Sequence, residues 1–232
     1  MSRKACLLGA TGLIGQHLLQ VLLKDAYYEE VHVLVRKALD YSDPKLVVHS
    51  IDFSQPAAYK PAIQGAETVF CAIGTTLKKV KGDREAYRKI DYDIPVAAAV
   101  TAAEAGVFGF VLVSSIGADA ANNNNFYLKL KGVVEEAVSK QQLPQVHIFR
   151  PSLLLGNRSE KRTGERIAQA LAPVYSLFLK GSWKKYHPIQ ADLVARAMLK
   201  AAKSSAKGIF IHDYTGIMQF IKDPHQESPI PI

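Results

Sequence analysis

A tyrosine and a lysine four residues apart, preceded by a pair of serines, are the side chains whose types and spacing best fit catalysis. Tyr127 and Lys131 lie in the segment Tyr-Leu-Lys-Leu-Lys, and a spacing of four places both on one face of a helix. A nearby ammonium favours the phenolate form, which helps a tyrosine to transfer a proton. Ser115, or its neighbour Ser114, can donate a hydrogen bond to a substrate oxygen that gains charge. The same spacing is common on amphipathic surface helices, where it has no chemical role.

A glycine-rich turn follows the first apolar run of the chain and indicates a nucleotide site. The run ends at Leu8 and is followed by Gly9, Ala10, Thr11, Gly12, Leu13, Ile14 and Gly15. Leucines at helical spacing then continue to Lys24. A strand, a Gly-x-x-Gly-x-x-Gly turn and a helix are the fingerprint of dinucleotide binding, because the glycines permit a tight turn and close approach to a pyrophosphate. The positive end of the helix dipole would face the phosphates. An ordinary strand-to-helix turn is the alternative.

The residues after the second expected strand bear on the choice of cofactor. A chain that prefers NAD places Asp or Glu there, about 20 residues beyond the glycines, to bind the ribose 2′-hydroxyl. Arg36 and Lys37 stand at this place instead. Two cations suit a 2′-phosphate, so the sequence predicts NADP (NADPH) rather than NAD. The alternative is that both cations are ordinary surface residues.

Three further strand ends carry residues expected to border the same cofactor. Asp52 can accept from an adenine amino group, and Phe53 can line the slot of the ring. Ala72, Ile73 and Gly74 are followed by two threonines, and the small residues there let the backbone pass close to a nucleotide unless they form a plain turn. Pro151 ends the sixth strand and is expected to form a wall for the nicotinamide.

The elements that must position these residues alternate as strand and helix. Strands are expected at 5–8, 31–35, 46–51, 68–73, 108–113, 146–149 and 208–212. Helices are expected from the glycine turn to Lys24, at 83–105 with a kink at Pro95, after the Asn-rich loop 122–125, and at 165–179 and 190–202. This order predicts an α/β fold with a doubly wound, mostly parallel sheet and a small C-terminal helical lid. We expect one domain over 1–232, a substrate lobe at about 151–207 and a mobile end at 223–232.

Composition excludes several classes of protein. The 232 residues are 48% apolar, which is typical of a globular domain. No apolar run reaches the length of a membrane span, and Cys6 and Cys71 lie in apolar runs, so both are expected to be buried thiols in a reducing, cytoplasmic setting. The net charge of +8 includes a basic segment at 78–89. Acidic residues interrupt this segment, which favours a solvated surface over a nucleic-acid groove.

Several motifs together resemble one known family. They are Gly-Ala-Thr-Gly-Leu-Ile-Gly, Arg-Lys, Cys-Ala-Ile-Gly-Thr-Thr, Val-Ser-Ser-Ile-Gly-Ala-Asp, Tyr-Leu-Lys-Leu-Lys-Gly and Phe-Arg-Pro-Ser-Leu-Leu-Leu. Over roughly residues 3–205 the chain resembles an atypical short-chain dehydrogenase/reductase and is most similar to the Tat-interacting-protein family. The resemblance implies a Rossmann domain that binds NADPH.

The resemblance also implies roles for individual residues. Ser115 would polarise a carbonyl, Tyr127 would donate the proton, and Lys131 would hold the nicotinamide ribose. Ser114 would lie beside the cofactor, and the backbone from Pro151 to Leu153 would meet the nicotinamide carboxamide. Many relatives add an asparagine that anchors a proton relay, whereas the nearest residue in this chain is Asp91. The pair of adjacent serines leaves two candidates for the serine role.

Three functions are consistent with these features. The first is an NADP-dependent oxidoreductase that transfers hydride to or from a carbonyl or alcohol carbon of a small-molecule substrate. The second is an NADPH-binding regulatory protein whose occupancy controls a protein partner, although such a protein has no need of a proton donor. The third is a nucleotide-sugar epimerase or dehydratase, which usually needs a larger C-terminal lobe. The substrate pocket is expected to include Thr76, Leu153, Leu154, Trp183 and Tyr186. The oligomeric state stays open.

Overall fold

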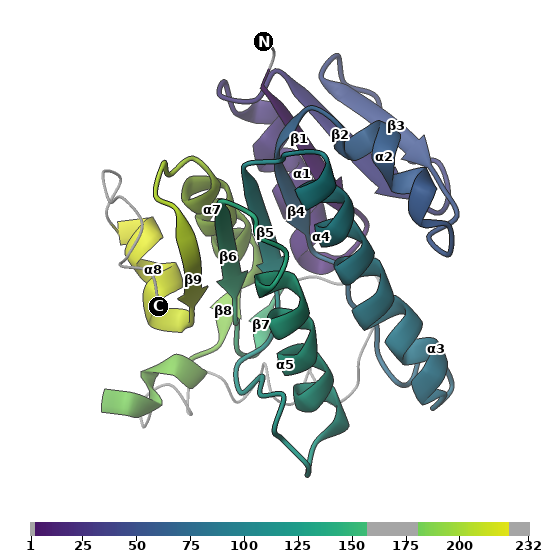
Figure 1. The fold of residues 1–232 in the computed structure, drawn as a ribbon. Coiled ribbons are helices and arrows are strands. Elements are labelled where there is room, and N and C mark those ends of the chain that lie inside the picture. Colours follow the sequence, from purple (N-terminus) through teal and green to yellow (C-terminus); the bar gives the residue numbers. More distant parts are fainter. Residues whose placement is uncertain (1–2, 157–180, 223–232) are drawn as a thin grey trace.

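The computed structural model of the chain describes residues 3–156 and 181–222, and within them seven parallel strands form one sheet. The strand order is β3-β2-β1-β4-β5-β6-β9 (Figure 1). The strands are β1 (Lys4–Leu8), β2 (Glu30–Val35), β3 (Leu46–Ser50), β4 (Ala66–Cys71), β5 (Gly109–Val113), β6 (Gln145–Phe149) and β9 (Gly208–His212). The central strands are largely buried and most of their residues are apolar, because helices cover both of their faces. The predicted doubly wound Rossmann fold is confirmed.

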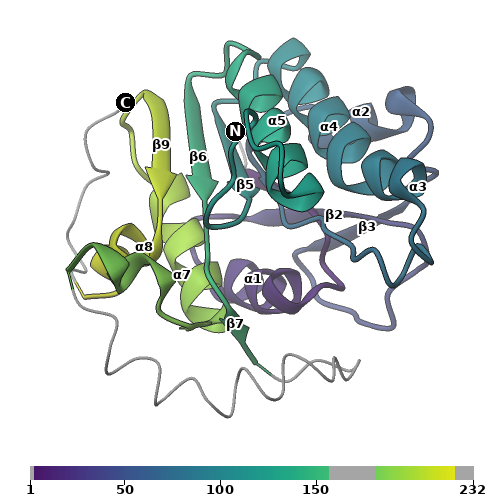
Figure 2. The same cartoon turned by 90° about the horizontal axis from the view of Figure 1, so that it is seen from below.

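Helices form a layer on each side of the sheet (Figure 2). On one face lie α1 (Leu13–Lys24) and α7 (Ala191–Ala202), which pack against each other and against inward residues of the strands. On the other face lie α2 (Lys60–Ile63), α4 (Ile94–Glu104) and α5 (Phe126–Ser139). Cys6 and Cys71 are buried free thiols in this second layer, as expected.

The sheet changes direction between β1 and β4, and this change creates the binding edge. From β1 the chain moves outward to β2 and β3, and then returns to β4 on the other side of β1. At such a switch point the loops after the two strands diverge, which leaves a crevice at the carboxyl ends of the strands. The glycine turn follows β1 here, and the Ala72–Thr75 segment follows β4.

The segment expected to be one kinked helix at 83–105 has three parts. They are α3 (Arg84–Arg88), a π-helical turn η2 (Lys89–Asp93) and α4. Asp83 caps the first part by accepting from two backbone amides. Pro95 directly follows the π-turn, and the backbone is helical on both sides of it, so the departure from regular α-helix lies at this turn.

The C-terminal part differs from the expected lid. The helix expected at 190–202 is α7, and it belongs to the layer on the sheet because its apolar face packs on α1. The helix expected at 165–179 and the end 223–232 lie outside the described residues. Elements not predicted from the sequence are a small sheet of β7 (Leu154–Leu155) and β8 (Ile189–Gln190), the turns η1 (Pro56–Tyr59) and η3 (Gly181–Tyr186), and the helices α2 and α8 (Tyr214–Lys222). Among the described helices, none combines the length and apolar character needed to cross a bilayer.

Candidate active site

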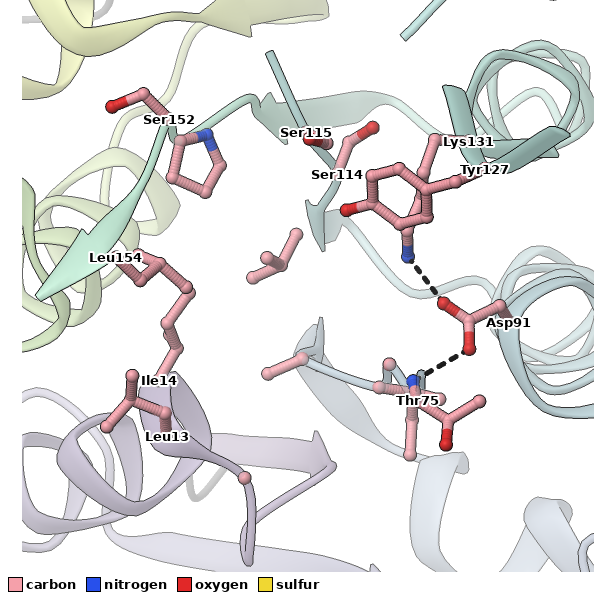
Figure 3. A pocket seen from close by; sticks show the side chains of 16 residues that line it. Leu13, Ile14, Thr75, Asp91, Ser114, Ser115, Tyr127, Lys131, Ser152 and Leu154 are labelled. Carbon is pink, nitrogen blue, oxygen red and sulfur yellow. Dashed lines mark hydrogen bonds and ion pairs between the residues drawn. The ribbon is translucent and has the colours of Figure 1, made fainter. Parts of the chain in front are cut away.

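A pocket lies at the carboxyl edge of the sheet, between the glycine turn and helix α5 (Figure 3). Loops after β1, β4, β5 and β6 contribute to it, together with the π-turn and the first turns of α5. Its lining residues are Gly12, Leu13, Ile14, Ala72, Ile73, Gly74, Thr75, Asp91, Val113, Ser114, Ser115, Tyr127, Lys131, Pro151, Ser152 and Leu154. The pocket therefore brings together the glycine turn and the serine, tyrosine and lysine set, which are far apart in the sequence.

The glycine turn is built by close contacts that exclude side chains. Gly9 has a φ of +89°, and a Cβ there would lie 2.6 Å from the carbonyl carbon of Ala72. A Cβ on Gly15 would lie 1.9 Å from the carbonyl oxygen of Gly9, so helix α1 rests directly on the turn. Gly15 and Ala10 are buried and Gly9 is partly buried, and none of the three lines the pocket, whereas Gly12, Leu13 and Ile14 do.

The N-terminus of α1 offers unsatisfied backbone amides to the pocket. Gly12 is the N-cap residue, and no side chain accepts a hydrogen bond from the first turn. The first amides of a helix have no partner within the helix, and they carry the positive end of its dipole. Leu13 and Ile14 therefore present a place suited to an anion.

Helix α5 presents Tyr127 and Lys131 to the opposite side of the pocket. The Asn-rich loop ends in Asn125, whose side chain caps the helix by accepting from the amide of Leu128 at 3.2 Å. The phenol oxygen of Tyr127 points into the cavity in Figure 3, and the side chain is 36% exposed. Tyr127 and Lys131 lie on one helical face, as the spacing predicted.

The ammonium of Lys131 lies behind the phenol and is paired with a carboxylate. Its Nζ is 3.1 Å from Oδ1 of Asp91, and the other carboxylate oxygen accepts from the amide of Thr75 at 2.7 Å. Burial has the largest single effect and lowers the pKa of Lys131, but the charge and hydrogen bond of Asp91, with the neighbouring Tyr127, together outweigh burial and the pKa is raised. The lysine is therefore held as a cation at neutral pH.

The two serines at the end of β5 have different hydrogen-bond partners. The buried Ser114 hydroxyl donates to Oε1 of Glu135 on α5. The Ser115 hydroxyl makes a long contact of 3.4 Å with the carbonyl of Ile116. Arg150 at the end of β6 donates to both carboxylate oxygens of Glu135. Ser114 is thus engaged by a charged group, whereas Ser115 is free to serve a ligand.

The segment after β6 forms the wall of the pocket beside α1. Pro151, Ser152 and Leu154 line the pocket, and Leu154 faces Leu13 and Ile14 in Figure 3. Leu153 does not line it, and its carbonyl accepts from the amide of Ile189 at 2.9 Å, next to the β7–β8 pair.

Other predicted residues lie outside the lining of this pocket. Thr11 is exposed on the glycine turn, and Arg36 and Lys37 are exposed just after β2. The Asp52 carboxylate accepts from the amide of Ser54 at 2.8 Å, and these hydrogen bonds lower its pKa. Three residues expected in the substrate pocket, namely Thr76, Trp183 and Tyr186, also lie outside its lining.

Phe53 is in edge contact with a neighbouring aromatic ring. Its ring centroid is 5.7 Å from that of Tyr59, and its carbonyl accepts from the Tyr59 hydroxyl at 2.9 Å. Phe53 therefore supports the layer of α2 and α4 next to the binding edge.

Several residues of the site were not predicted from the sequence. Thr75, Val113 and Ser152 line the pocket, and their positions directly after or within strand ends were the available signal. Glu135 follows Lys131 by one helical turn, so helical spacing places it on the same face of α5, but spacing does not indicate its partners Ser114 and Arg150. Within the described residues, no group of three His, Cys, Asp or Glu side chains could hold a metal ion.

Comparisons with known proteins agree with this geometry. A family model described as NAD(P)H-binding matches residues 9–205. Protein FMP52, mitochondrial, of Debaryomyces hansenii is 35% identical over 201 residues, which cover 85% of this chain and 87% of that protein. Protein HTATIP2 of Rattus norvegicus is 31% identical over 210 residues, which cover 89% of this chain and 84% of that protein.

Solved structures show the same fold at low sequence identity. A UDP-glucose 4-epimerase of Thermotoga maritima, solved with UDP-glucose, has a TM-score of 0.67 at 15% identity, covering 98% of this chain and 85% of that chain. The Bordetella bronchiseptica enzyme WbmH, solved with NAD+, has a TM-score of 0.68 at 16% identity, covering 100% of this chain and 85% of that chain. The chain belongs to the NAD(P)H-binding family and, within it, to the Tat-interacting-protein-like group of atypical short-chain dehydrogenases/reductases.

Proposed function

We propose that the protein is an NADPH-dependent oxidoreductase that acts on a carbonyl or alcohol group of a small molecule. The observation that carries this proposal is the position of the Tyr127 phenol. It points into the same pocket that the N-terminus of α1 borders, and the Lys131 ammonium lies behind it. A proton donor beside a nucleotide site is what carbonyl reduction requires.

The residues of the pocket fit a nicotinamide dinucleotide. The uncapped amides at Leu13 and Ile14 would hold the pyrophosphate, and Gly12 leaves space for it. The Ala72–Gly74 backbone and Pro151 would border the ribose and the nicotinamide. Bound NADPH would supply the hydride, and the protein residues supply the proton and the orientation.

Ser115, Tyr127 and Lys131 would each have a separate role in the reaction. Ser115 would donate a hydrogen bond to the carbonyl oxygen, which gains negative charge during reduction. Tyr127 would give its proton to that oxygen, and the Lys131 cation would stabilise the phenolate that remains. In the direction of oxidation, the same phenolate would act as the base.

Cofactor preference is tested by comparing NADPH with NADH. Arg36 and Lys37 lie at the end of β2, where the ribose 2′-substituent is bound in this fold. NADPH should raise the unfolding temperature more than NADH at equal concentration, because only its 2′-phosphate attracts the cations. In Arg36→Ala the rise in unfolding temperature caused by NADPH should come closer to that caused by NADH, while the rise caused by NADH stays the same. Equal stabilisation of the unmodified protein by both would contradict the preference.

Activity is tested with NADPH and a panel of aromatic aldehydes and quinones, following the loss of NADPH. Turnover that requires Tyr127 supports the oxidoreductase. Tight NADPH binding without turnover of any compound supports the regulatory alternative, in which occupancy controls a protein partner. The name of the Debaryomyces relative places that protein in mitochondria. Localisation of a tagged chain therefore decides between the expected cytoplasm and a mitochondrial site.

A further inference from the structure

The buried carboxylate of Glu135 faces two strand ends that border the pocket. Glu135 lies one helical turn beyond Lys131 on α5 and is 5% exposed. It accepts from the Ser114 hydroxyl and from Arg150, whose Nε lies 3.0 Å from Oε1 and 3.1 Å from Oε2. Arg150 also donates through Nη2 and neutralises the buried charge. One carboxylate thus joins α5 to the ends of β5 and β6.

The backbone around the serines is held without this carboxylate. The amide of Ser114 donates to the carbonyl of Phe149 at 2.7 Å, and the amide of Ile116 donates to that of Pro151 at 3.0 Å. These two bonds lie on either side of Ser115 and continue the pairing of β5 with β6. Glu135 therefore mainly orients the side chain of Ser114, and the position of the backbone around Ser115 does not depend on it.

A serine hydroxyl has one proton to donate. Because the proton of Ser114 is directed to Glu135, Ser114 presents only its lone pairs to the pocket that it lines. The long contact of 3.4 Å from Ser115 to Ile116 is near the outer limit of a hydrogen bond, so the proton of Ser115 remains available to a ligand. The two adjacent serines thus differ as donors.

We propose that Glu135 is a positioning residue that fixes the hydroxyl proton of Ser114 and thereby leaves Ser115 as the serine that donates to the substrate oxygen. This inference rests on the proposed oxidoreductase function. Without Glu135 the Ser114 hydroxyl could rotate and donate into the pocket. It would then compete with Ser115 and Tyr127 for the oxygen that reacts.

The test measures kcat and KM for NADPH-dependent reduction of an aromatic aldehyde, together with NADPH affinity and unfolding temperature. Ser115→Ala should lower kcat by about 10²–10³-fold, as expected for loss of one donor to a developing oxyanion. Ser114→Ala should lower kcat by less than about 10-fold, because its proton does not serve the substrate. Equal losses of kcat in the two serine variants would overturn the inference, and this comparison leaves Glu135 and Arg150 intact.

The decisive measurement is whether removing the Ser114 hydroxyl restores the kcat that is lost in Glu135→Gln. Glu135→Gln should lower kcat with little change in NADPH affinity, since a glutamine amide can donate to Ser114 and release its proton. In the double variant Ser114→Ala/Glu135→Gln there is no competing hydroxyl, so kcat should rise above that of Glu135→Gln alone. A double variant with the same kcat as Glu135→Gln, or a lower one, would mean that Glu135 is only structural.

The matched control for the proposed function is Tyr127→Phe. If this variant keeps its turnover, the proposed function fails. If it is inactive but the serine variants are equal, only the role of Glu135 fails. No turnover by the unmodified protein would overturn both.

Discussion

The Nζ atom of Lys131 lies 3.1 Å from Oδ1 of Asp91, and both side chains are almost completely buried. Because the second oxygen of Asp91 accepts from the amide of Thr75, one carboxylate connects α5 to the loop after β4. These two segments form one side of the pocket, opposite the glycine turn. The pair therefore fixes the distance between the phenol of Tyr127 and the Gly74–Thr75 backbone.

Asp91→Asn should strongly destabilise the protein. The amide can still accept from Thr75, but the ammonium of Lys131 is left buried without a countercharge, which typically costs about 3–5 kcal/mol. The measurement is the free energy of unfolding from urea denaturation. NADPH affinity should fall as well, because the loop after β4 borders the pocket.

Asp93→Asn is the matched control. It removes a carboxylate two residues away, which is 3.0 Å from Arg88 in a pair with both side chains about half exposed. Exposed pairs contribute about 0–1 kcal/mol, so this variant should stay close to the unmodified protein. Similar losses of unfolding free energy in Asp91→Asn and Asp93→Asn would show that the buried pair with Lys131 contributes no more stability than the exposed pair with Arg88.

Tyr127→Phe should abolish turnover and leave NADPH affinity nearly unchanged. In the proposed reaction only the phenol oxygen acts on the substrate, whereas the ring, which the variant keeps, borders the pocket. The measurements are kcat for aldehyde reduction and the Kd for NADPH by fluorescence titration. Tyr41→Phe, at a side chain that is 44% exposed and outside the pocket, should retain full turnover. Normal turnover by Tyr127→Phe would end the catalytic assignment.

The parallel sheet and the two sides of the pocket could be predicted because each depends on local signals. Apolar runs marked the strands, glycine spacing marked the turn after β1, and a spacing of four placed Tyr127 and Lys131 on one helical face. The strand order then follows from the topology typical of this fold. These signals need no knowledge of long-range contacts.

Asp91 and Glu135 show why the remaining part of the site could not be predicted. The position of Asp91 depends on a π-helical turn, which has no reliable sequence signal and changes the face on which a residue lies. The partners of Glu135 come from the ends of two other strands, so the network exists only in the folded chain. Helix α7 was expected in a lid, but its apolar face equally suits packing on α1.

Two alanine substitutions in the glycine turn should affect different properties, one mainly the stability of the fold and the other mainly the affinity for NADPH. A Cβ at position 15 would lie 1.9 Å from the Gly9 carbonyl oxygen, so Gly15→Ala must move helix α1 and should lower the unfolding temperature sharply. A Cβ at position 12 would have its nearest contact at 3.3 Å, so Gly12→Ala should fold with a small loss of stability. Its methyl group borders the pocket and should weaken NADPH binding by about 10-fold or more. Unchanged NADPH affinity in Gly12→Ala would exclude close approach of the pyrophosphate.

A buried pair of histidines gives the fold its expected sensitivity to acid. Nδ1 of His147 on β6 lies 2.9 Å from Nε2 of His212 on β9, and both side chains are 0% exposed. Burial lowers the pKa of His147 to about 3, with His212 adding to the effect, and burial lowers the pKa of His212 to about 4. Both rings are therefore neutral in the folded protein at neutral pH, among Phe149, Phe210 and Phe220.

Stability should fall as the pH drops below about 6.5, the ordinary pKa of histidine in an unfolded chain. Between that pH and the lowered pKa values, the unfolded state binds protons that the folded state does not. Each histidine should then cost about 2 kcal/mol between pH 7 and pH 5, measured as the free energy of unfolding in urea. The double variant His147→Gln/His212→Gln lacks both titrating groups, so its stability should fall less over the same range. The control is His17→Gln on α1, which should keep the pH dependence of the unmodified protein. If the double variant kept it as well, other groups would be responsible for the acid sensitivity.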